Sequence, residues 1–100
     1  SALDLVDLQA VERDFAFIVD NKVEASDLVI AATGADKQLI QDVRVFDEFV
    51  GKEFGNEKKS IALTVRLQPA EKTLTDAEIE DLSKKVIEKV ENATGGVLRT

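Results

Sequence analysis

Five side chains of this 100-residue sequence have the chemistry needed to hold one nucleotide, provided that they share one face of a sheet. The ring of Phe49 could stack on a splayed base, which is worth about 1–3 kcal/mol. The carboxylate of Asp47 could accept a hydrogen bond from a base amino group, and Arg99 could bind a phosphate or a base edge. The Ser60 hydroxyl and the small side chain of Ala16 would add a hydrogen bond and room for close approach. Four-stranded sheets commonly read single-stranded RNA in this way.

The composition excludes several kinds of catalysis. The sequence has no Cys, so thiol nucleophiles, disulfides and thiolate metal sites are excluded. It has no His, so a His general base, a Ser-His-Asp triad and imidazole metal ligands are excluded as well. With 44% hydrophobic and 33% charged residues, the sequence has the composition of a folded domain. We therefore expect one α+β domain with no catalytic residues, no metal site and no cofactor of its own.

Apolar periodicity predicts the elements that must position the five side chains. Alternation predicts strands over residues 13–19, 41–50 and 59–67, and helical spacing predicts a helix over residues 25–33. A capping box of Thr75 and Glu78 begins a longer helix that ends at Gly95, and residues 97–100 can form a last strand.

This β-α-β-β-α-β order is the ferredoxin-like split βαβ arrangement, in which two helices cover one face of a four-stranded antiparallel sheet. We expect it over residues 11–100. We expect residues 1–10 to be a lead-in arm, either from a preceding domain or left by cloning or processing.

Alternation also predicts which side chains reach the open face. In the first strand, Phe15 and Phe17 should lie under the helices, which leaves Ala16 outward. In the third strand, the alternate apolar residues 61, 63 and 65 should point inward, which leaves Ser60 outward.

The second strand has an irregular phase, which we interpret as a bulge or a change of face near Val45 and Phe46. We expect Phe46 to be buried, in which case Asp47 and Phe49 point outward together. Leu98 pointing inward would leave Arg99 outward in the last strand. All five candidate residues would then share the open face.

The charge distribution argues against strong non-specific binding of RNA. The net charge is −7, and residues 1–57 hold 13 acidic and 5 basic residues. Because phosphate contacts require Lys or Arg, we expect RNA to approach Lys58, Lys59, Arg66 and Arg99. We expect the isolated chain to bind RNA weakly.

Five strings that occur in order resemble a known family. They are Arg13-Asp14-Phe15-Ala16, Phe46-Asp47-Glu48-Phe49 with Gly51, Lys59-Ser60-Ile61-Ala62, Lys72-Thr73-Leu74-Thr75-Asp76 with Glu78, and Leu98-Arg99. Together they resemble the ferredoxin-fold anticodon-binding domain at the C-terminus of bacterial phenylalanine–tRNA synthetase β subunits. The resemblance covers roughly residues 9–100.

The resemblance implies that the chain docks on the anticodon stem-loop of phenylalanine tRNA, with the rest of the β subunit and the α subunit of an α2β2 enzyme as partners. It implies that the parent is a cytoplasmic class II enzyme that uses ATP and Mg, with its catalytic centre in the α subunit. It places the RNA-binding residues at Ala16, Asp47, Phe49, Ser60 and Arg99.

This sequence departs from the family pattern at two positions. Phe49 stands where Tyr is usual, so stacking is retained but a phenolic hydrogen bond is lost. Lys72 stands where Arg is usual, which removes bidentate geometry at that position.

Two alternatives remain open at this point. One is a regulatory domain of the same fold that binds a small ligand or dimerises through its sheet, for which Gly34 and Gly55 are loose candidates at a strand–helix edge. The other is an acylphosphatase-like enzyme, which needs a phosphate-cradling loop near the first strand. Arg13 precedes that strand, but no Gly-rich loop follows it.

Overall fold

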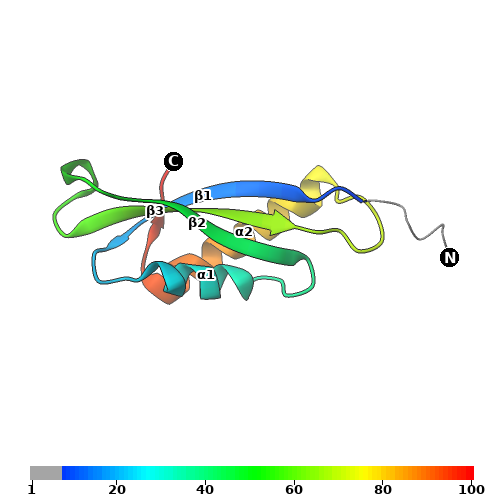
Figure 1. Cartoon of the computed structure of the whole chain (residues 1–100), viewed down its shortest axis with the longest axis horizontal. Coiled ribbons are helices and arrows are strands. Elements are labelled where there is room, and N and C mark those ends of the chain that lie inside the picture. The colour runs from blue at the N-terminus through cyan, green and yellow to red at the C-terminus, as the bar shows by residue number, and fades with distance from the viewer. Residues whose placement is uncertain (1–7) are drawn as a thin grey trace.

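The structure is a computed structural model that describes residues 8–100, and it confirms the ferredoxin-like order. The described elements, with the 3₁₀ turn labelled η2, are β1 (Val11–Asp20), α1 (Ala25–Thr33), β2 (Ile40–Val50), η2 (Lys52–Phe54), β3 (Lys58–Leu67), α2 (Asp76–Thr94) and β4 (Val97–Leu98). The antiparallel sheet has the order β2-β3-β1-β4. Both helices lie on one side of the sheet, so its other side is open (Figure 1). Most of the lead-in arm expected over residues 1–10 lies outside the described residues, and the boundary at residue 11 stays a prediction.

The hydrophobic core lies between the sheet and the two helices. Phe15 and Phe17 from β1 are buried, as the alternation predicts, and their rings stack with centroids 6.4 Å apart. The inward residues of β3 and the apolar stripe of α2 complete this core: Ile61, Leu63, Val65, Leu67, Ile79, Leu82, Val86 and Val90. Because side chains alternate along a strand, the buried residues of β1 and β3 determine which of their neighbours face the open side.

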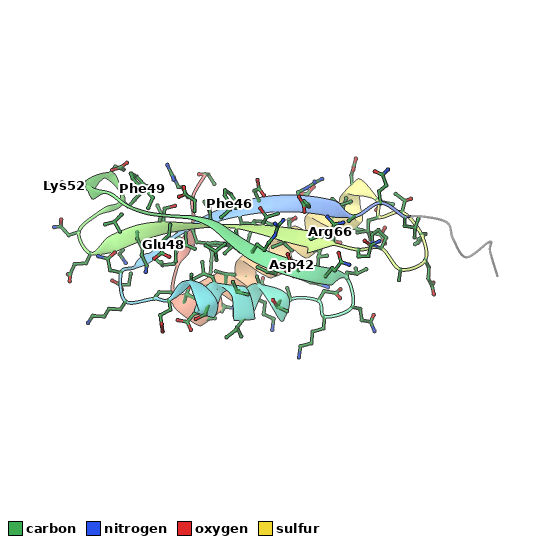
Figure 2. All side chains as sticks on the ribbon, viewed as in Figure 1. Asp42, Phe46, Glu48, Phe49, Lys52 and Arg66 are labelled. Atoms are coloured by element: carbon green, nitrogen blue, oxygen red, sulfur yellow. The ribbon has the colours of Figure 1, made fainter. Side chains whose placement is uncertain are left out.

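The bulge expected in β2 is present, but the prediction that Phe46 is buried is wrong. The pairing with β3 steps from Val45 opposite Leu63 to Asp47 opposite Ala62, so Phe46 is the extra residue of the bulge. Its side chain is 57% exposed and lies on the side away from the helices (Figure 2). The bulge itself changes the face, since an inserted residue shifts the alternation by one. Asp47 is therefore outward because of the bulge and not because Phe46 is buried.

We expect Phe46→Ala to lower the free energy of unfolding by at most about 1 kcal/mol, because less than half of the ring's surface is removed from water. Urea denaturation of the wild type and the variant measures this difference. A loss of about 3 kcal/mol or more, the value typical of a buried Phe, would show that Phe46 belongs to the core.

The predicted capping box sets the start of α2. Thr75 Oγ1 accepts from the Glu78 amide at 3.1 Å, and Glu78 Oε1 accepts from the Thr75 amide at 2.9 Å. Gly95 ends the helix in the left-handed conformation, with φ of 73°, which glycine adopts without strain. Neither helix among residues 8–100 is long and apolar enough to cross a membrane.

The capping box makes stability depend on pH in a defined direction. The hydrogen bonds from the Thr75 amide and hydroxyl hold the pKa of Glu78 below its ordinary value of 4.5. A lowered folded pKa contributes stability that is fully present above the ordinary value and is lost as the pH falls through the folded pKa. We therefore expect the stability difference between the wild type and Glu78→Gln to be constant near pH 7 and to shrink below about pH 4.5. Thermal denaturation at a series of pH values measures it, and a difference that grows on acidification would contradict the assignment.

Candidate nucleic-acid interface

The open face of the sheet has two halves, and one is occupied by internal ion pairs. We call it the ion-pair half; its residues are Glu12, Asp14, Asp42, Arg44, Thr64 and Arg66. Arg66 lies 3.2 Å from the Glu12 carboxylate, and Arg44 lies 3.1 Å from Asp42 and 3.6 Å from Glu12. The Thr64 hydroxyl donates to Asp14 at 2.7 Å. These side chains satisfy one another, so this half offers few groups to a ligand.

The other half, which we call the Phe49 half, contains the five residues expected from the sequence. Ala16 pairs with Ala62, and Asp47 lies opposite Ala62 from the other side. Phe49 lies opposite Ser60, the next outward residue of β3. Ala16 and Ala62 therefore form a floor of small side chains, beside which the exposed Asp47 and the 47% exposed Phe49 stand on β2.

Arg99 joins this half through its backbone and its side chain. Its amide donates to the Ala16 carbonyl at 2.7 Å, which fixes the chain after β4 beside β1. Its guanidinium donates to Ser60 Oγ at 3.4 Å, a long hydrogen bond. The structure thus brings Arg99 into direct contact with Ala16 and Ser60. The pairing of β2 with β3 places Asp47 opposite Ala62 and Phe49 opposite Ser60.

Phe54 is a member of this half that the sequence did not reveal. Its ring lies edge-to-face with Phe49 at 5.6 Å, and the Arg99 guanidinium carbon lies 4.7 Å from its centroid. Phe54 belongs to η2, which returns over the sheet after Gly51. A Cβ on Gly51 would lie 3.2 Å from the Phe49 ring, so glycine leaves that ring its space. In the sequence, the one sign that Phe54 belongs to this half is an aromatic residue within an otherwise polar loop.

Ser60 differs from the expected outward, accessible hydroxyl. It faces the open side, but it is only 4% exposed. Arg99 donates to its oxygen, and Phe49 lies opposite it on β2. The hydroxyl is therefore placed to hold the guanidinium, while Phe49, Asp47 and Arg99 present the accessible groups.

Three of the four cations that RNA is expected to approach have carboxylate partners within the chain. Lys59 is 8% exposed and lies 2.9 Å from Glu48, and Lys58 lies 3.9 Å from Asp20. Arg66 is bound to Glu12 and Gln41. Arg99 instead contacts a ring and a hydroxyl. Phosphate attraction from this part of the chain is therefore smaller than its count of Lys and Arg indicates.

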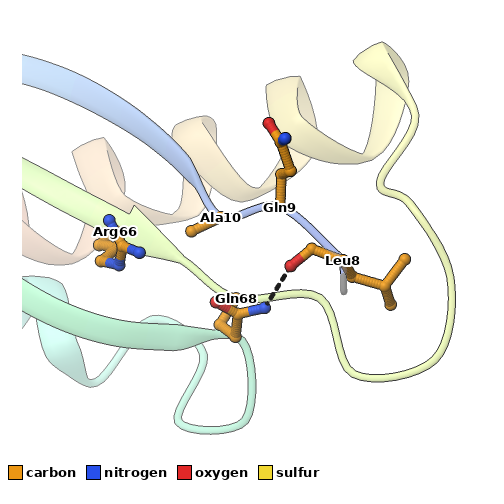
Figure 3. Close-up of a pocket in the computed structure, with 5 residues that line it drawn as sticks. All are labelled: Leu8, Gln9, Ala10, Arg66 and Gln68. Atoms are coloured by element: carbon orange, nitrogen blue, oxygen red, sulfur yellow. Dashed lines mark hydrogen bonds between the residues drawn. The ribbon is translucent and has the colours of Figure 1, made fainter. Parts of the chain in front are cut away.

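Hollows lined by the described residues also lie away from the Phe49 half. An open hollow of about 320 Å³ lies where the chain enters β1, beside Gln68, whose amide donates to the Leu8 carbonyl at 2.9 Å (Figure 3). Arg13, the residue of the acylphosphatase alternative, lines a groove with Asp76 and Glu80 of α2. Carboxylates beside this arginine repel phosphate, so the groove does not fit a phosphate substrate.

The fold and the open face define a ferredoxin-like domain that leaves one side of its sheet available to a ligand. Residues 7–99 match the family described as the ferredoxin-fold anticodon binding domain, and the chain belongs to this family.

Relatives of the chain include three phenylalanine–tRNA ligase β subunits. That of Ruegeria pomeroyi is 66% identical over 99 residues, which are 99% of this chain and 12% of the relative. That of Cereibacter sphaeroides is 63% identical, over 98% of this chain and 13% of the relative. That of Mesorhizobium japonicum is 59% identical, over 97% of this chain and 12% of the relative. The chain spans about one eighth of the length of these relatives.

Proposed function

We propose that this chain binds the anticodon stem-loop of phenylalanine tRNA as a domain of a phenylalanine–tRNA ligase β subunit. The observation that carries the proposal is the convergence of Phe49, Asp47 and Arg99 around a floor of small residues, on the side of the sheet without helices. A ring, an acceptor and a guanidinium suit an unstacked base, and single-stranded loops present such bases. The family membership and the relatives named above support the same function.

We assign a separate role to each of the five residues. Phe49 stacks on a base, Asp47 accepts from a base amino group, and Ala16 lets the nucleotide approach the sheet. Ser60 holds the Arg99 guanidinium, which supplies the cationic group beside Phe49 and Phe54. Binding by the isolated chain is weak, because its net charge of −7 repels phosphates.

The parent enzyme in this proposal attaches phenylalanine to its tRNA with ATP and Mg, as a cytoplasmic class II α2β2 synthetase. Residues 8–100 contain no group of three or more His, Cys, Asp or Glu side chains that could hold a metal ion. We place that chemistry in other parts of the parent, and the rest of the β subunit and the α subunit are the expected protein partners.

A titration of the chain with the unmodified anticodon stem-loop of phenylalanine tRNA, followed by amide chemical shifts, tests the proposal. We expect shifts at Ala16, Asp47, Phe49, Ser60 and Arg99 and unchanged signals along the outer faces of α1 and α2. The matched control is the same stem-loop with its three anticodon bases exchanged, which should bind more weakly. Shifts centred on the helices, or equal affinity for both loops, would overturn the proposal.

A further inference from the structure

The Arg99 guanidinium is held on two sides by its own chain. Its carbon lies 4.7 Å from the centroid of the Phe54 ring, within the range of a cation–π contact. One terminal nitrogen of the guanidinium donates to Ser60 Oγ, and the backbone amide of Arg99 donates to the Ala16 carbonyl. The residue nevertheless remains exposed. The guanidinium is therefore held by a ring and a hydroxyl while the residue stays open to solvent.

We propose that Arg99 is a stacking platform for a second base of the RNA rather than a ligand for a phosphate, and that Phe54 is the positioning residue that holds its plane. This inference rests on the proposed function and assigns a second base position to it. Bases in RNA complexes stack on guanidinium planes as well as on aromatic rings. Phe49 contacts Phe54, and Phe54 contacts Arg99. A base stacked on the Arg99 guanidinium would extend this row of contacts by one group.

The surroundings of Arg99 favour stacking over phosphate binding. Its guanidinium contacts the Phe54 ring and the Ser60 hydroxyl, and its backbone lies beside Ala16, and these surroundings suit a flat, weakly charged ligand. The two lysines of β3 that could share a phosphate have carboxylate partners: Lys59 lies 2.9 Å from Glu48, and Lys58 lies 3.9 Å from Asp20. A chain with a net charge of −7 gains more from a contact that does not depend on a phosphate.

The first test compares Arg99→Lys with Arg99→Ala in the stem-loop titration. Lys keeps the charge but has no plane, so we expect both variants to lose affinity about equally, by about tenfold. We also expect the salt dependence of binding to be the same as in the wild type. Wild-type affinity in Arg99→Lys, or a salt slope reduced by about 0.7 in Arg99→Ala, would identify a phosphate contact and overturn the inference.

The second test finds the base that stacks. Stem-loops are prepared in which each loop base in turn is removed, while its sugar and phosphate remain. We expect one such abasic loop to bind the wild type and Arg99→Ala equally, because the partner of Arg99 is then missing. If Arg99→Ala reduces affinity for every abasic loop, Arg99 stacks on none of these bases.

The third test addresses Phe54 with and without RNA. In Phe54→Leu, the ring-current shifts of the Arg99 side-chain protons should disappear, and Phe54→Tyr should retain them. Phe54→Leu should weaken RNA binding in the wild type but not in the Arg99→Ala background, which shows that Phe54 acts through Arg99. Additive losses would overturn the positioning role. If the wild type fails to bind the stem-loop at all, the proposed function fails, whereas binding with intact Arg99→Lys affinity refutes only the stacking.

Discussion

Phe17→Ala is expected to lower the free energy of unfolding by about 3–5 kcal/mol, the range for truncating a buried aromatic residue. The Phe17 side chain is 0% exposed, stacks on Phe15, and lies in the core between β1 and the helices. Domains of this size have a total stability of about 5–15 kcal/mol, so the variant would lose a large part of it. Urea denaturation followed by circular dichroism measures the change.

Two matched controls accompany Phe17→Ala. Phe46→Ala removes the same side chain from the exposed bulge of β2, and Ile30→Ala removes an apolar side chain that is 71% exposed on α1. Both should leave stability almost unchanged. Equal losses for Phe17→Ala and Phe46→Ala would contradict the placement of the core on a single side of the sheet.

Phe49→Ala is expected to weaken binding of the anticodon stem-loop by about 5- to 150-fold, since stacking of one base on an aromatic ring is worth about 1–3 kcal/mol. The fold should be retained, because almost half of the side chain is exposed and its described ring contact is with Phe54 at the surface. Isothermal titration or chemical-shift titration measures the affinity, and a thermal melt checks the fold.

The chain offers graded controls at the same position. Phe49→Tyr keeps a stacking ring and adds a phenolic hydroxyl, so it should bind at least as well as the wild type. Phe49→Leu keeps apolar volume without a ring and should resemble Phe49→Ala. Full binding by Phe49→Leu would show that residue 49 provides packing and no stacking.

The periodic elements could be predicted from the sequence because each has one clear buried face. The helix over residues 25–33 agrees with α1 at both ends, and the capping box of Thr75 marks the start of α2. The strand of residues 59–67 differs from β3 by one residue. In these elements local periodicity and tertiary packing favour the same structure.

The failures come from features that have no periodic signal. A bulge shifts the alternation by one residue, so Phe46 was expected in the core although it lies at the surface. Burial of Ser60 depends on Arg99, which is 39 residues away in the sequence. Phe54 reaches the Phe49 half because η2 folds over the sheet, and the sequence of a loop does not specify where it returns. Side-chain partners across distant segments are set by tertiary structure alone.

The mutual neutralisation within the ion-pair half has a kinetic consequence. A surface on which Arg44 and Arg66 are balanced by Glu12 and Asp42 creates little long-range potential. Such a surface does not attract a polyanion at long range, and the net charge of −7 repels one, so association of the isolated chain is slow. In the proposed function, capture of the nucleic acid would fall to basic surfaces elsewhere in the parent enzyme, and this domain would discriminate at short range after the encounter.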